Sequence, residues 1–276
     1  MRFDDRDIDW LANVLAEVAA QEIMPRFRRL NASEVRRKTS AADLVTEADV
    51  NAERAITAAI AERYPDVLIV GEEAREVDHS LLPRLSGAEL AFVIDPVDGT
   101  FNFASGVPLF GVMLAVVDSG ETVAGIIHDP VGKDFLIGVR GAGSHIHSQD
   151  GIQTPVKVAE PVPVSAMTGA VSWQFMPEPE RSRLAKNHAK CLSQLNYRCA
   201  AHEYRIIASG HAHFAVYNKL MPWDHLAGVL IHQEAGGHAA RLDGSPYLPS
   251  HLAGGLMIAP DRASWAELRR ELWAQQ

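Results

Sequence analysis

The sequence lacks features that define several classes of protein. It has two cysteines among 276 residues, Cys191 and Cys199, and no Cys-x-x-Cys spacing, so neither a disulfide framework nor a cysteine zinc site is indicated. No run approaches the roughly 18 apolar residues that a membrane-spanning helix needs. The acidic N-terminal stretch has no apolar core of a secretory signal. We therefore expect a cytoplasmic protein with reduced thiols and no membrane partner.

Positive charge is also scarce. The formal net charge is −9, from 26 Lys and Arg residues against 35 Asp and Glu residues. A sequence-independent hold on a nucleic-acid backbone needs a basic surface, so the composition argues against nucleic acid as a partner. The local exception, the basic region 26–38, is typical of a solvated helix end. Otherwise the composition, with 47% hydrophobic residues, is that of a globular chain with a sizeable core.

The first part of the chain passes from helical to extended patterns. Apolar residues at helical spacing predict helices at 8–30 and 46–63, and Thr46 with Asp49 has the form of a capping box. Period-two patterns then predict a mostly antiparallel block with a hairpin turn at 118–122. The strands of this block are expected at 67–70, 90–94, 109–118, 122–129 and 134–140.

The second part begins after a proline-rich connector at 158–165. Strands and helices alternate in it, which favours layered sheets and helices. We interpret the chain as two closely joined halves, 1–155 and 156–276, of one α/β (α+β) unit. In the second half, strands are expected at 168–173, 196–199, 213–217 and 256–259, and helices at 179–191, 201–209, 223–235 and from 262 onward.

Two carboxylates stand out at a predicted strand end. Asp95 and Asp98 lie three residues apart across Pro96, directly after the apolar run 90–94. Such acids repel each other unless a cation or a proton lies between them. Helix capping and solvated turns explain most single acids, including Asp224, but explain this pair poorly. The residues alone leave two interpretations open: structural acids, or an oxygen-ligand site for a hard cation such as Mg²⁺ that acts on phosphate.

Other motifs support weaker hypotheses. His211 and His213 lie on one face of a predicted strand, but no third zinc ligand is evident, so ordinary surface histidines fit better. His225 lies beside Asp224 and could reach the same site. The segment 140–146 lacks the third glycine and the following helix of a dinucleotide loop, and it reads as a hairpin.

Four segments, in order, resemble the inositol monophosphatase family of Mg²⁺-dependent, lithium-sensitive phosphatases. They are DLVTEAD (43–49), VGEE (70–73), DPVDGTFNF (95–103) and PWDHLAG (222–228), followed by QEAGG (233–237). The resemblance covers most of the chain, from about Lys38, where the family often has a lysine near the metal loop. It implies a five-layer αβαβα sandwich of the sugar-phosphatase type, a homodimer, and sensitivity to lithium.

The resemblance also implies a metal site with two to three Mg²⁺ ions. One ion would be held by Glu72, Asp95 and the carbonyl of Val97. A second would be held by Asp95, Asp98 and Asp224, with Asp95 bridging the two ions. Glu72 would help to hold the weaker third ion.

Catalytic and substrate-binding roles follow from the same resemblance. Thr100 and Asp49 would orient and deprotonate the attacking water, beside Glu72, and the amides of Gly99 and Thr100 would cradle the phosphate. The remaining residues expected to contact the substrate are Asp98, Glu203, Tyr217 and Asp224.

The implied activity is hydrolysis of a small phosphomonoester such as inositol 1-phosphate. The segment 198–210 and Tyr217 depart from the family pattern where the alcohol is recognised. Histidinol phosphate, fructose 1,6-bisphosphate and a 3′-phosphonucleotide therefore remain alternative substrates. A hypothesis of another class is a non-catalytic scaffold that binds the transcription machinery.

Overall fold

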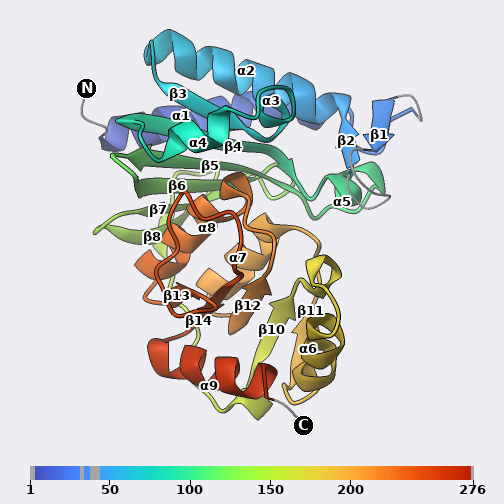
Figure 1. Cartoon of the computed structure of the whole chain (residues 1–276). Helices are drawn as coiled ribbons and strands as arrows, with labels where there is room; N and C mark the ends of the chain where they lie inside the picture. Colours follow the sequence, from blue (N-terminus) through green and yellow to red (C-terminus); the bar gives the residue numbers. More distant parts are fainter. Residues whose placement is uncertain (1–3, 32–33, 38–43, 275–276) are drawn as a thin grey trace.

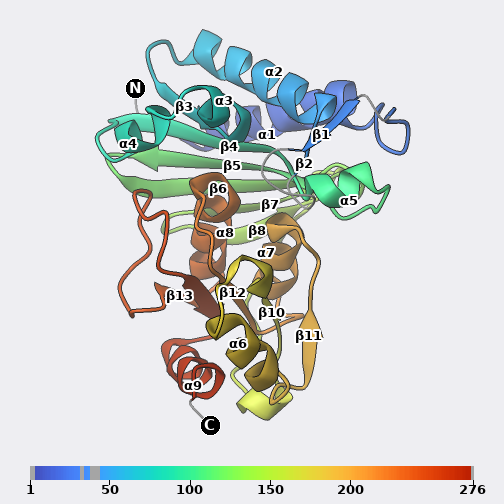
Figure 2. The ribbon, with the colours of Figure 1, turned by 45° about the vertical axis from the view of Figure 1, so that its right-hand side comes forward.

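The computed structural model describes residues 4–31, 34–37 and 44–274, so that Lys38 and Asp43 lie outside the described residues. The described chain is stacked in five layers (Figure 1). Helices α1 (Asp5–Val18) and α2 (Glu47–Arg63) cover one sheet, α7 (Ala200–Ala208) and α8 (Pro222–Glu234) lie between two sheets, and α6 (Glu180–His188) and α9 (Arg262–Leu272) cover the second sheet (Figures 1 and 2). The predicted αβαβα sandwich is confirmed.

The first sheet has seven strands that follow the order of the chain. β3 and β4 are parallel, and every later pair is antiparallel, which confirms the mostly antiparallel block. Ser119 and Gly120 both adopt positive φ, as a two-residue hairpin turn requires. The strands are β3 (Leu68–Gly71), β4 (Leu90–Asp98), β5 (Gly111–Asp118), β6 (Glu121–Asp129), β7 (Asp134–Val139), β8 (Gly143–His147) and β9 (Gln153–Pro155).

Alternation along the strands explains the layers. In β4, Phe92 and Ile94 pack with α1 and α2 in one core cluster. Ala91 and Val93 point the other way and pack with α7 and α8. Because successive side chains of a strand face opposite sides, a strand that is apolar throughout is covered on both faces.

The second sheet has five strands in the order β11-β10-β12-β14-β13. The strand predicted at 196–199 is wrong, because the extended run lies three residues earlier. Arg198 adopts a left-handed φ of 52°, and Cys199 is already the N-cap of α7. β13 was not predicted. The strands are β10 (Thr168–Val171), β11 (Ser193–Leu195), β12 (Phe214–Tyr217), β13 (His238–Arg241) and β14 (Leu256–Ala259).

Each helix that the sequence predicted is present, but several short elements were not predicted. The first helix ends earlier than expected: a π-helical turn (Ala19–Ile23) extends α1, and turns follow it around Pro25. No helix among the described residues is both long and apolar enough to cross a membrane. The short elements that the sequence did not predict include β9 and β13, and also α3 (Glu72–Val77), α4 (Leu81–Leu85), α5 (Thr100–Ala104), β1 (Val35–Arg37) and β2 (Leu44–Thr46).

Candidate active site

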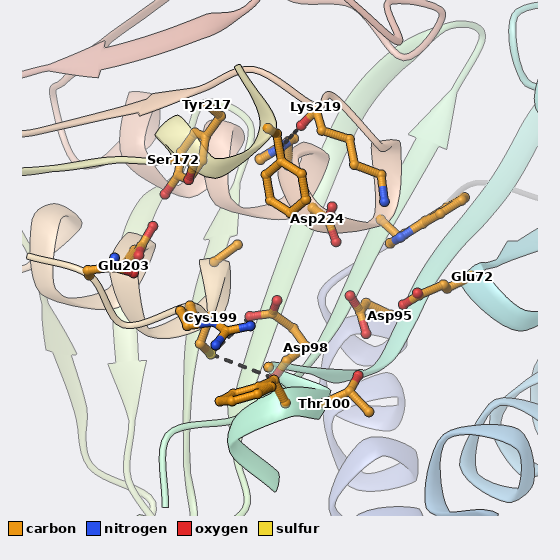
Figure 3. Close-up of a pocket in the computed structure, with 18 of the residues that line it drawn as sticks. Glu72, Asp95, Asp98, Thr100, Ser172, Cys199, Glu203, Tyr217, Lys219 and Asp224 are labelled. Carbon is orange, nitrogen blue, oxygen red and sulfur yellow. Dashed lines mark hydrogen bonds between the residues drawn. The ribbon is translucent and has the colours of Figure 1, made fainter. Parts of the chain in front are cut away.

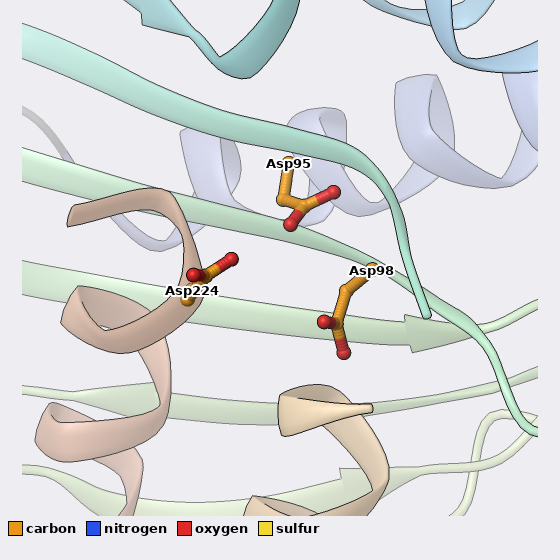
Figure 4. Close-up of side chains that lie close together, drawn as sticks. All are labelled: Asp95, Asp98 and Asp224. Carbon is orange, nitrogen blue, oxygen red and sulfur yellow. The ribbon is translucent and has the colours of Figure 1, made fainter. Parts of the chain in front are cut away.

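Three of the predicted acids converge. β4 runs past its expected end at Ile94, and its register with β5 shifts between Asp95 and Asp98. Asp224 approaches them from the first turn of α8 (Figure 4). One oxygen of each carboxylate lies within 4.8 Å of the others, and among the described residues no other group of three acids, histidines or cysteines is placed to hold a metal ion.

Burial and mutual repulsion dominate the electrostatics of this cluster. Asp95 is 1% exposed. Its burial, and then the charges of Glu72, Asp98 and Asp224, raise its pKa well above the usual range. Burial and the charges of Glu72 and Asp98 raise the pKa of Asp224 to about 8, against the pull of Lys219. Carboxylates in this arrangement need protons or a cation between them.

Asp98 is held by the start of α7. Its Oδ2 accepts the N–H of Ala201 at 2.6 Å and the thiol of Cys199 at 3.0 Å. Burial raises the pKa of Asp98, and these hydrogen bonds oppose that rise. Cys199 is therefore a supporting residue that the sequence analysis missed. No local signal marks it, because its partner Asp98 lies 101 residues away in the chain.

Asp49 and Thr100 form the expected pair. The capping box of α2 is present: Asp49 Oδ2 accepts the N–H of Thr46 at 2.9 Å and its hydroxyl at 2.5 Å. The other oxygen, Oδ1, lies 3.1 Å from the Thr100 hydroxyl, which also lies 3.0 Å from the carbonyl oxygen of Val97. Burial is the main cause that raises the pKa of Asp49 to about 7.

Glu72 is the first residue of α3 and lines the same pocket. Its side chain extends toward Asp95 (Figure 3), although it is not part of the tight three-acid cluster. The first turn of α3 is held from α2 by Glu53, whose carboxylate accepts the N–H groups of Glu73 and Ala74, each at 2.7 Å. Glu53 is a second supporting residue that the sequence analysis missed.

Gly99 stands between the strand and α5. It adopts a φ of +87°, and a Cβ built on it would lie 2.9 Å from the carbonyl oxygen of Leu109. Only glycine meets both demands without strain. The turn therefore brings Thr100 to the wall of the pocket, two residues after Asp98.

The predicted substrate residues Glu203 and Tyr217 line another part of the pocket, away from Glu72 and Thr100 (Figure 3). Glu203 accepts the N–H of Tyr197 at 3.2 Å. Burial raises its pKa to about 7, although the Tyr217 hydroxyl opposes that rise. The structure thus brings all the predicted site residues into one pocket or, for Asp49, into direct contact with its wall.

The structure does not support a ligand role for the histidines considered in the sequence analysis. His213 Nδ1 accepts the N–H of Thr168 at 3.1 Å, and no third ligand joins His211 and His213 in the described part of the chain. His225 lines the pocket, but its Nε2 lies 2.9 Å from the Lys219 carbonyl and its Nδ1 lies 3.2 Å from the Tyr204 hydroxyl. Both ring nitrogens are occupied, which makes His225 part of the pocket wall.

The five-layer sandwich with buried carboxylates at the end of β4 has the architecture of the sugar-phosphatase type. Residues 4–276 match the inositol monophosphatase family, and the chain belongs to it. That membership places the chain among the phosphoric monoester hydrolases, as the sequence resemblance predicted.

Individual relatives carry several names. A histidinol-phosphatase of Chlorobaculum parvum is 32% identical over 235 residues, which is 82% of this chain and 83% of the relative. A protein of Haemophilus influenzae named Nus factor SuhB is 29% identical over 252 residues, covering 90% and 89% of the two chains. The solved structure of an inositol monophosphatase from Zymomonas mobilis matches with a TM-score of 0.79 at 24% identity. The match covers 99% of this chain and 100% of that one. That structure supports the fold.

Proposed function

We propose that the protein is a Mg²⁺-dependent phosphomonoesterase that hydrolyses a small phosphorylated alcohol. The observation that carries the proposal is the convergence of Asp95, Asp98 and Asp224, with oxygens within 4.8 Å, in a pocket that also contains Thr100. Structural acids do not need to gather in this way, whereas a metal-dependent hydrolase that acts on phosphate needs carboxylates gathered to hold its ions.

The donor set fits Mg²⁺. Hard cations prefer carboxylate and carbonyl oxygens, and the proposed ligands Glu72, Asp95, Asp98, Asp224 and the carbonyl of Val97 supply only these. Among the described residues that line the pocket, Cys199 is the one thiol, and it is engaged with Asp98. When bound, Mg²⁺ would acidify a water and offset the negative charge of the phosphate.

The chain's own residues would then position the water. The Thr100 hydroxyl donates its one hydrogen toward Asp49 or the carbonyl of Val97, so its oxygen can accept a hydrogen bond from a water in the pocket. Asp49 can take the proton, because a base whose pKa is near 7 is suited to neutral pH. The amides of Gly99 and Thr100 are proposed to bind the phosphate.

The substrate is proposed to be inositol 1-phosphate or a similarly small ester. The relative named histidinol-phosphatase supports histidinol phosphate as the leading alternative. Fructose 1,6-bisphosphate and a 3′-phosphonucleotide stay on the same list. Phosphate release from this panel, with Mg²⁺ and with excess chelator, separates these substrates and tests the metal. Equal turnover under both conditions would refute the proposed mechanism.

The Asp95→Asn variant tests the site itself. We expect a loss of more than about 100-fold in kcat/KM, because even outer partners of metal ligands cost 10- to 100-fold. The fold should persist, since the change relieves repulsion in the cluster. Asp118→Asn, which removes an exposed carboxylate at the end of β5, is the matched control and should keep full activity.

The name of the Haemophilus influenzae relative supports a second proposal, a scaffold that binds the transcription machinery. The two proposals separate in one variant. If Asp95→Asn loses phosphatase activity but still binds RNA polymerase as the natural protein does, the scaffold role is independent of the site.

A further inference from the structure

The pocket contains a cation, Arg198, beside the aromatic ring of Phe101. Its side chain is half-buried and lines the pocket, and its guanidinium lies 3.5 Å from the centroid of the Phe101 ring. Within the described residues it makes no ion pair and donates no side-chain hydrogen bond. A guanidinium carries five N–H donors in a planar fork, and stacking on a ring leaves the edges of that fork free.

The backbone conformation of Arg198 also indicates a functional role. Its φ is +52°, a left-handed conformation that costs free energy for a residue with a side chain. Such conformations persist where surrounding structure enforces them, and they concentrate at functional sites. Here the conformation sits between the end of β11 and the N-cap of α7, directly beside Cys199, which contacts Asp98.

Lys219 is a second cation of this pocket, and it also lies over an aromatic ring. Its Nζ is 5.8 Å from the centroid of Phe175, and its side chain extends beside Asp224 in the close-up view (Figure 3). No ion pair involves Lys219 in the part of the chain that the structure describes. Phe175 is 51% exposed, so this pair lies near the mouth of the pocket.

We propose that Arg198 and Lys219 bind a second anionic group of the substrate, so that the enzyme prefers phosphomonoesters that also carry a phosphate or a carboxylate. This inference rests on the proposed phosphomonoesterase function. In this proposal the reacting phosphate is bound at Asp95, Asp98 and Asp224, and the stacked guanidinium of Arg198 takes the second group. A guanidinium pairs most strongly with an anion that accepts two parallel hydrogen bonds, and both phosphate and carboxylate can do so.

The test compares matched ligands that differ by one charged group. Fructose 1,6-bisphosphate is paired with fructose 1-phosphate, and 3-phosphoglycerate is paired with glycerol 3-phosphate, so the two pairs separate a phosphate from a carboxylate. For the natural protein, kcat/KM should be higher for the doubly anionic member of at least one pair. In Arg198→Gln that preference should fall by roughly 10- to 100-fold, the size of one charge-assisted hydrogen bond. Lys219→Gln should lower it by a smaller factor, because this cation is exposed.

Lys133→Gln is the matched control, since Lys133 is an exposed cation with a φ of +57° outside the pocket. It should leave the preference unchanged. Equal losses in Arg198→Gln for both members of each pair would overturn the proposal and assign Arg198 to the reacting phosphate. No preference in the natural protein would also overturn it.

Calorimetric binding of the same ligand pairs gives this comparison without turnover. If no ester is hydrolysed, the proposed function fails. The second anion site then stands or falls on whether Arg198→Gln weakens only the doubly anionic ligands.

Discussion

At the scale of single residues, the hydroxyl of Thr100 is proposed to link the attacking water to Asp49, the residue that takes its proton. It lies within hydrogen-bond distance of the Asp49 carboxylate and of the Val97 carbonyl, 3.1 and 3.0 Å away. One hydroxyl hydrogen can serve only one of these acceptors, so the oxygen keeps lone pairs for a water. Its role would be to orient and relay, and it needs no charge of its own.

Thr100→Val tests this role with almost no change of volume. We expect kcat to fall by about 10²- to 10⁴-fold, the usual range for general base catalysis, while KM changes little. Thr100→Ser keeps the hydroxyl and should recover much of the rate. Steady-state kinetics at saturating Mg²⁺ measures both values. A Val variant with normal kcat would remove Thr100 from the mechanism.

Asp95, Asp98 and Asp49 could be singled out from local signals in the sequence, whereas Glu72 and Asp224 were assigned to the site only through the family resemblance. Asp95 and Asp98 flank Pro96 at the end of an apolar run, and Asp49 follows Thr46 in a capping box. Cys199 and Glu53 could not be predicted, since their partners are 101 and 20 residues away in the chain. Only the fold brings such groups together.

At the scale of secondary structure, α3 is a short helix whose start depends on another helix. Its N-cap, Gly71, has no side chain to accept the first N–H groups. Glu53 of α2 supplies the acceptor, and a Cβ on Gly71 would lie 2.2 Å from the Glu53 carboxyl carbon. Glycine at this position therefore makes room for the carboxylate that orders the turn bearing Glu72.

Glu53→Ala should disorder that turn. Two partly buried N–H groups would lose their acceptor, at a cost of about 1–3 kcal/mol in the free energy of unfolding. The Mg²⁺ concentration for half-maximal activity should rise roughly 10- to 100-fold, because Glu72 loses its support. Urea unfolding and metal titration measure the two effects. Glu62→Ala, on the exposed face of the same helix, is the control, and an equal response in both variants would contradict the role of Glu53.

Helices and strands were predicted correctly where the hydrophobic pattern continues over many residues. The predictions of their ends were unreliable where tertiary contacts define those ends. The apolar run of β4 was identified, but its continuation to Asp98 was not, because polar residues with a proline normally end a strand. The strand expected at 196–199 fails for a related reason. β11 already ends at Leu195, and the left-handed backbone of Arg198 does not fit a strand over 196–199.

At the scale of the whole molecule, the site lies where the two sheets are joined by the middle helical layer. β4 supplies Asp95 and Asp98, and α8, which packs on the first sheet, supplies Asp224. The distance between α8 and the first sheet therefore sets the position of Asp224. Gly125 of β6 permits close contact: a Cβ there would lie 2.6 Å from the carbonyl oxygen of Ala227 in α8.

Gly125→Ala should push α8 away from the sheet. Overpacking of this kind costs about 1–3 kcal/mol of stability. Displacement of Asp224 should lower kcat/KM further, since a misplacement of about 1 Å can cost 100-fold. Gly87→Ala is the matched control, because Gly87 is exposed and the nearest atom to an added Cβ is 4.0 Å away. Thermal unfolding and kinetics on the folded fraction separate the two effects. A destabilised Gly125→Ala protein with unchanged kcat/KM would show that the placement of Asp224 does not depend on how closely α8 packs.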